Sequence, residues 1–113
     1  MSGRMAKVNS MIARIVGEIL QRDAELPDGV LVTVSRVDTA PNLRKTEVWL
    51  FILPDGVEET VMTGLQEQMY DIQGEFNRAV ELHPLPRIIF RVDSGARHAA
   101  HINEKLEELK KED

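Results

Sequence analysis

The sequence contains no cysteine among its 113 residues, which excludes a disulfide framework, a thiol nucleophile and a cysteine-based zinc site. Aromatic residues make up only 4% of the chain, so the core of the single domain that this length allows must be aliphatic. No apolar run approaches the roughly 18 residues of a membrane-spanning helix, and no signal-peptide core follows the N-terminus. We therefore expect a cytoplasmic protein with one domain over residues 1–113, frayed at residues 1–4 and 110–113.

Positive charge is scarce, and its balance with negative charge differs between the two halves of the chain. The formal net charge is −5; residues 1–53 carry seven Lys and Arg against six Asp and Glu, whereas residues 54–113 carry seven against thirteen. An acidic protein is a poor candidate for bulk electrostatic binding to nucleic acid, because such binding depends on neutralising phosphates. Any nucleic-acid site must therefore be a local cluster of cations.

Hydrophobic periodicity in the first half predicts one helix and a hairpin. Residues 5–22 carry apolar side chains at spacings of three and four, which is typical of an amphipathic helix. The β-branched residues 30–38 and the apolar residues 45–53 predict two antiparallel strands. The second strand is apolar through most of its length, a pattern typical of a strand covered on both faces.

The second half of the chain predicts a bent pair of helices. A helical stripe runs from Val57 to Val80, and we expect a bend between residues 68 and 75, because so long a stripe that contains glycine invites a break. Asp55, with Glu58 three residues later, has the spacing of a capping box and is the predicted N-cap.

A third strand and a last helix complete the predicted domain. Residues 87–93 read as a strand and residues 96–110 as a helix. The helix carries an apolar stripe of Ala99, Ile102, Leu106 and Leu109. The prediction is an α+β domain of the order α-β-β-α-α-β plus a C-terminal helix, with a three-stranded sheet packed against helices.

The sequence carries no convincing catalytic, metal or cofactor motif. His98, His101 and Glu104 would share one side of a helix, but three ligands in successive turns span roughly 9 Å, so a solvated helix face is favoured over a metal site. Ser94 lacks the surroundings of a nucleophile elbow and fits a turn that caps a helix. Walker-type and dinucleotide-binding glycine patterns are absent. We expect a protein that is not an enzyme and needs no cofactor or metal.

Two classes of binding module fit the predicted order of elements. Few aromatic residues disfavour base-stacking platforms, but a KH-type domain holds the nucleic-acid backbone beside a turn between two helices and needs few of them. A protein-interaction or regulatory module that docks through its acidic helices fits the same order. The pattern of elements leaves both open.

Several motifs, in order along nearly the whole chain, match one known family. They are Ile-Leu-Gln-Arg-Asp at residues 19–23, Thr-Val-Ser-Arg-Val at residues 33–37, and the strand and Asp-Ser turn at residues 86–94. The sequence thereby resembles bacterial ribosome-binding factor A. The resemblance implies a type II KH fold and a monomeric, cytoplasmic, non-enzymatic assembly factor. It also implies binding to the immature 30S small ribosomal subunit and 16S rRNA, and help with late maturation including 5′-end processing of 16S rRNA; an assembly GTPase is a further candidate partner.

Departures from the family pattern fall in the acidic helices. Residues 68–70, Gln-Met-Tyr, stand where the family has Ala-x-Gly, and Gln73 and His83 stand where arginine is usual. Residues 55–81 hold seven acidic side chains and one basic one. We therefore expect RNA contact to shift toward the first helix and the hairpin loop. The candidate RNA-binding residues are Arg4, Lys7, Arg14, Arg44, Lys45, Gln73, Asn77, Arg78, Arg97 and His98.

Overall fold

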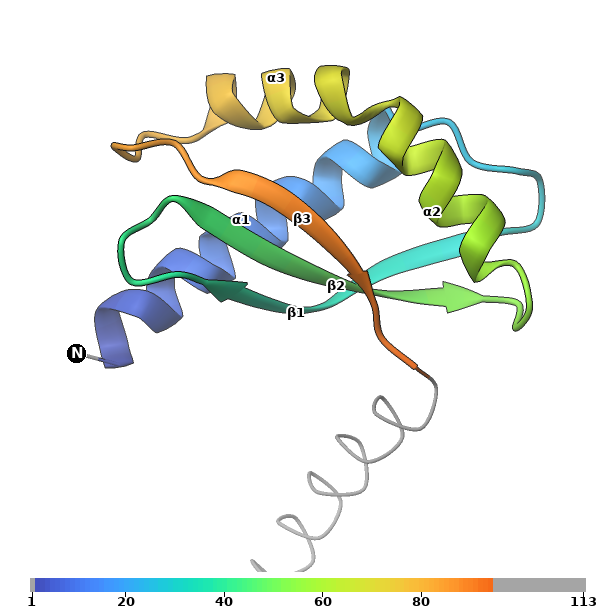
Figure 1. Ribbon diagram of the computed structural model, residues 1–113, viewed down its shortest axis with the longest axis horizontal. Coiled ribbons are helices and arrows are strands. Elements are labelled where there is room, and N and C mark those ends of the chain that lie inside the picture. The colour runs from blue at the N-terminus through green and yellow to red at the C-terminus, as the bar shows by residue number, and fades with distance from the viewer. Residues whose placement is uncertain (1, 95–113) are drawn as a thin grey trace, which may run out of the picture.

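The computed structural model describes residues 2–94, which form helices and strands in the order helix, strand, strand, helix, helix, strand (Figure 1). The elements are α1 (Ser2–Arg22), β1 (Leu31–Thr39), β2 (Lys45–Leu53), α2 (Glu58–Glu67), α3 (Met69–Ala79) and β3 (Arg87–Val92). This order confirms the predicted α+β class. The predicted helix over residues 96–110 lies outside the described residues. No helix within residues 2–94 is both long and apolar enough to cross a membrane.

The sheet has β2 at its centre, with the order β1-β2-β3. β1 and β2 pair antiparallel, which confirms the predicted hairpin, and β3 pairs parallel to β2. A parallel pair needs a crossover connection, and α2 and α3 supply it. This crossover returns the start of β3 to the end of the sheet where the hairpin turns (Figure 1).

A bulge in β1 changes which side chains enter the core. The register between β1 and β2 shifts between Val34 and Arg36, so that Ser35 is the extra residue. Val32 is buried before the bulge, whereas Val37 and Thr39 are buried after it. A strand without a bulge would have turned Val37 away from the helices, because side chains alternate between the two faces.

The core lies between the helices and one face of the sheet. Along β2, Val48, Leu50 and Ile52 are at most 3% exposed, whereas Trp49 and Phe51 between them are half-buried. The core cluster is aliphatic apart from Phe76 and Phe90, as the composition predicts. Its aliphatic members are Ile12, Ile15, Val16, Ile19, Leu20, Val61, Leu65, Ile72, Val32, Val37, Val48, Leu50, Ile52, Val80 and Ile88. Within residues 2–94, the helices cover only one face of the sheet. The sequence predicts that β2 is covered on both faces, so the cover of its other face does not come from the described residues.

The predicted helix starts need two corrections. α1 begins at Ser2, earlier than the predicted residue 5. The N-cap of α2 is Val57, without a side-chain hydrogen bond, so the prediction of Asp55 as N-cap is wrong. Gly56, at φ +93°, extends the turn beyond Asp55, and its N–H donates to Oε1 of Glu58 at 2.6 Å.

Gln68 marks the break between α2 and α3, which confirms a bend at the first residue of the predicted range. Its side chain pairs with the backbone of Glu25, which follows α1: the Glu25 N–H donates to Oε1 at 2.7 Å, and Nε2 donates to the Glu25 carbonyl at 2.9 Å. Nε2 also donates to the Gly64 carbonyl at 3.1 Å. The break between the helices is thereby joined to the α1–β1 connection.

Candidate nucleic-acid interface

Four chain segments reach the same end of the molecule. The N-terminus of α1, the β1–β2 turn, the end of α3 and the start of β3 all lie at the left of Figure 1. Each segment contributes exposed basic side chains. We call this set the basic end: Arg4, Lys7, Arg44, Lys45, Arg78 and Arg87.

The turn between β1 and β2 holds two of these cations in place. The Leu43 N–H donates to the Ala40 carbonyl at 2.8 Å, and the Ala40 N–H donates to the Lys45 carbonyl at 2.9 Å. The side chain of Asn42 accepts the Arg44 N–H at 3.0 Å, a local bond that asparagine commonly makes in turns. Arg44 and Lys45 therefore leave a turn of fixed backbone geometry.

Backbone pairing joins the other segments to this turn. The Arg87 N–H donates to the Arg44 carbonyl at 3.1 Å, and Lys45 lies opposite Arg87 in the parallel register. On the other side, the side chain of Asn9 in α1 accepts the Thr39 N–H at 3.1 Å. Within residues 2–94, no member of the basic end takes part in an ion pair. Their charges are thus available to an external anion.

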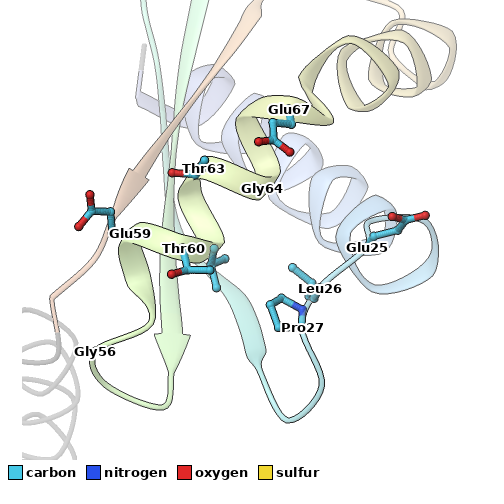
Figure 2. Close-up of a pocket in the computed structure, with 10 residues that line it drawn as sticks. Glu25, Leu26, Pro27, Gly56, Glu59, Thr60, Thr63, Gly64 and Glu67 are labelled. Carbon is cyan, nitrogen blue, oxygen red and sulfur yellow. The ribbon is translucent and has the colours of Figure 1, made fainter.

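Acidic side chains gather at the opposite end. A groove of about 710 Å³ lies between α2 and the α1–β1 connection. Figure 2 shows Glu25 and Glu67 on its two sides, with Leu26 and Pro27 opposite Thr60. Carboxylates repel phosphate, so this groove is unsuited to a nucleic-acid backbone. The basic end and this acidic groove therefore lie at opposite ends, although Glu47 near Lys45 and Glu81 just after α3 also place carboxylates near the basic end.

A second groove, of about 810 Å³, follows α3 toward the basic end. Tyr70, at the start of α3, is 90% exposed in its wall. Arg78 and Arg87 line the same groove. A side chain at Gly74 would place its Cβ 3.5 Å from a guanidinium nitrogen of Arg78, so the arginine lies along the helix surface over this glycine.

The amide of Gln73 is fully used inside the protein. Nε2 donates to Oδ1 of Asn77 at 2.9 Å and to the Pro86 carbonyl at 3.0 Å, and Oε1 accepts the Ile88 N–H at 2.9 Å. Gln73 therefore fixes α3 to the start of β3 and positions Asn77 in the groove. Its structural role is clear, whereas its predicted contact with RNA stays a prediction.

Electrostatics differ between the two ends of the α3 groove. Midway along α3, a hydrogen bond with the Asp23 carboxyl is the main cause that raises the pKa of Glu75 above its usual value. The hydrogen bond from Arg22, followed by that with Glu75, lowers the pKa of Asp23. The Arg22 Nε to Asp23 Oδ2 distance is 2.9 Å. The carboxyls of Asp23 and Glu75 disfavour anions, and Arg78, one turn after Glu75 in α3, carries the positive charge that a phosphate needs.

The structure brings together most, but not all, of the predicted RNA-binding residues. Arg4, Lys7, Arg44, Lys45, Asn77 and Arg78 lie at or beside the basic end. Arg14 lies midway along α1, where its guanidinium is 3.3 Å from Oε1 of Glu18. Arg97 and His98 lie outside the described residues, as do His101 and Glu104. Within residues 2–94, no cluster of three His, Cys, Asp or Glu side chains could hold a metal ion.

Two residues of the interface escaped the sequence-based prediction. Arg87 reaches the basic end because β3 pairs parallel with β2 beside Lys45, and local periodicity carries no signal for that pairing. The sequence analysis noted Tyr70 only as one of the residues that replace the family's Ala-x-Gly turn. An exposed aromatic residue at a break between two helices is nevertheless a signal of a binding surface.

Comparison with known proteins identifies one family. The sequence model of ribosome-binding factor A matches residues 4–106. The chain is 33% identical to ribosome-binding factor A of Akkermansia muciniphila, over 98% of this chain and 88% of that one.

Solved structures give the same fold. The solution structure of a Thermotoga maritima protein described as a ribosome-binding factor A matches with a TM-score of 0.68 and 27% identity, over 81% of this chain and 89% of that one. A homology model of the Thermus thermophilus factor, fitted into a cryo-EM map of its 30S complex, matches with a TM-score of 0.61 and 19% identity, over 74% and 88% of the two chains. These structures have a KH-like fold, which confirms the predicted architecture.

Proposed function

Because the chain belongs to the ribosome-binding factor A family, we propose that it is a ribosome-binding factor that acts on the immature small subunit by holding 16S rRNA at the basic end. One observation carries this proposal: six cations from four chain segments converge on one end of an otherwise acidic molecule. Phosphate contacts from lysine and arginine supply most of the sequence-independent affinity for nucleic acid.

The geometry favours recognition of the RNA backbone. Arg44, Lys45 and Arg87 are held by main-chain hydrogen bonds, so little backbone freedom is lost when they bind. Arg78 extends this positive surface into the α3 groove, where Tyr70 offers a ring on which an unpaired base can stack. Binding at this surface would hold one arrangement of rRNA while other parts of the subunit mature.

The finer parts of the proposal follow the family resemblance. The factor acts as a cytoplasmic monomer without catalytic activity, and it assists late maturation, including processing of the 5′ end of 16S rRNA. An assembly GTPase is a candidate for the partner that releases it.

A second candidate function is a protein-interaction module that docks through its acidic helices. The groove lined by Glu25, Glu59 and Glu67 favours it, because carboxylates beside the apolar side chains of Leu26 and Pro27 fit a basic peptide. Association that depends on protein concentration and not on RNA would support this alternative.

Co-sedimentation with purified immature small subunits at low and high salt tests the leading proposal. The double variant Arg44→Gln/Lys45→Gln should bind roughly tenfold or more weakly, because two charge-assisted contacts are lost. The matched control is Glu59→Gln/Glu67→Gln at the acidic end, which should bind at least as well as the wild type. Absence of binding to any particle at low salt would refute the proposal.

The maturation role needs a separate measurement in cells. We expect that cells carrying Arg44→Gln/Lys45→Gln as their only copy accumulate small-subunit rRNA with an unprocessed 5′ end. Normal 5′ ends, despite weakened binding in vitro, would limit the proposal to binding alone.

A further inference from the structure

The face of the sheet that is turned away from the helices carries a set of apolar side chains. Alternation along β2 places Trp49, Phe51 and Leu53 on this face, and the pairing adds Leu31 from β1 and Ile89 from β3. Leu31 is 55% exposed and Leu53 is 40% exposed. We call these five residues the open face. Within residues 2–94, no helix packs against it.

A buried carboxylate lies beside the open face. Asp93 follows β3 directly, and the alternation of β3 turns its side chain to the same side as Ile89. It is only 6% exposed. Its Oδ2 accepts the Ser35 hydroxyl at 2.6 Å, whereas its Oδ1 is buried without a hydrogen-bond partner among the described residues. A buried acceptor of this kind normally has a partner, which a donor from outside residues 2–94 or a water molecule would supply.

We propose that residues 96–110 of this chain form an amphipathic helix that packs on the open face of the sheet. Their apolar residues Ala99, Ile102, Leu106 and Leu109 recur at spacings of three and four, so one side of such a helix is apolar. The apolar side of the helix would then pack against the apolar side chains of the open face.

The chain leaves the sheet at a position from which residues 96–110 can reach the open face. The Asp93 N–H donates to the Leu50 carbonyl at 2.7 Å, so the chain is still paired with the central strand one residue before Ser94. A helix over residues 96–110 spans roughly 22 Å, which fits within the roughly 30 Å of a nine-residue strand such as β2.

Covalent attachment favours this segment over a second copy of the chain. A tethered segment is present at an effective concentration on the order of millimolar, well above that of free protein in most solutions. The occupied face also explains why β2 has the apolar sequence of a strand covered on both sides. Nucleic acid is the weaker occupant at the Leu31 and Leu53 end of this face, because these side chains offer it neither charge nor an aromatic ring. At the other end, the Arg36 guanidinium already lies 5.9 Å from the ring centroid of Trp49.

The only tryptophan of the chain, Trp49, reports on this face in the full-length protein. Ile102→Asp and Leu106→Asp each place a charge in the apolar stripe. Both variants should shift the emission of Trp49 to longer wavelength and raise its quenching by acrylamide. His101→Asp introduces the same residue on another side of the predicted helix and should leave both readings at wild-type values.

Three outcomes would overturn the proposal. The first is wild-type emission and quenching in both stripe variants, and the second is an equal change in His101→Asp. The third is quenching that falls as the concentration of wild-type protein rises, which would assign the face to a second copy. Far-ultraviolet circular dichroism and thermal melting check that the variants stay folded. The measurement needs no ribosome, so its result is independent of the proposed function.

Discussion

Gln73 shows how a polar side chain on a helix becomes part of the scaffold. The three hydrogen bonds of its amide join α3 to the first residues of β3. The resemblance predicted the position as an RNA contact, because arginine is usual there. Its partners Pro86 and Ile88 lie beyond the turn that follows α3, so the sequence held no signal for this set of bonds.

Gln73→Ala should lower the free energy of unfolding by about 1–3 kcal/mol, because the N–H of Ile88 and the carbonyl of Pro86 lose their partner. Ile88 is only 3% exposed, so water replaces that partner poorly. Urea denaturation of the full chain measures the effect. The control Gln66→Ala removes an exposed glutamine of α2 and should change stability by less than about 0.5 kcal/mol. Equal effects of the two substitutions would contradict the role assigned to Gln73.

The junction between α1 and α3 is held by polar contacts whose strength depends on pH. Asp23 follows α1 and Glu75 lies in α3, and a hydrogen bond between their carboxyl groups raises the pKa of Glu75. The folded protein therefore holds this proton more tightly than the unfolded chain does. The resulting stabilisation is complete below the usual pKa of a glutamate and is lost as the pH rises through the raised pKa.

Glu75→Gln should consequently be more stable than the wild type near neutral pH, and the difference should shrink as the pH falls. Unfolding by urea at several pH values between about 4 and about 7 measures it. Asp23→Asn supplies the control background, because it removes the partner that raises the pKa of Glu75. In that background, Glu75→Gln should add a smaller pH-dependent gain, because the burial that also raises this pKa remains. A gain of the same size in both backgrounds would show that another group is responsible.

Local sequence pattern predicted the helices and strands better than it predicted their ends or their relative placement. Periodicities of 3.6 and 2 located each helix and strand within residues 2–94, and the long stripe after residue 57 broke at Gln68, inside the expected range. The predicted N-cap of α2, Asp55, was wrong, because the turn at Gly56 continues one residue farther than a capping box allows. The bulge at Ser35 was also missed, since it depends on pairing with β2 and on Asp93 rather than on neighbours in sequence.

The distribution of charge over the whole molecule could be anticipated only in part. The sequence predicted that cations from the first helix and the hairpin loop would form the positive surface, and the structure places Lys7 and Lys45 at the same end. Arg87, which the sequence did not single out, joins them together with the predicted Arg78, because the crossover through α3 returns the chain to the hairpin end of the sheet. That contribution is a property of topology, which composition and spacing do not encode.

The basic end should give small-subunit binding a steep dependence on salt. Each phosphate contact contributes about 0.7 to 0.9 to the slope of log affinity against log salt concentration, because a bound cation displaces counterions. Lys7→Gln, Arg78→Gln and Arg87→Gln should each reduce the slope by roughly that amount. Arg14→Gln is the matched control, since Arg14 lies away from the basic end and is paired with Glu18.

Equilibrium binding of each variant to purified small subunits over a series of salt concentrations measures these slopes. An equal reduction in Arg14→Gln would show that charge in general, and not its placement at the basic end, governs binding. Unchanged slopes in all three test variants would move the phosphate contacts away from this end. Such a result would refute the site while leaving membership of the family intact, because the match to ribosome-binding factor A rests on residues 4–106 as a whole.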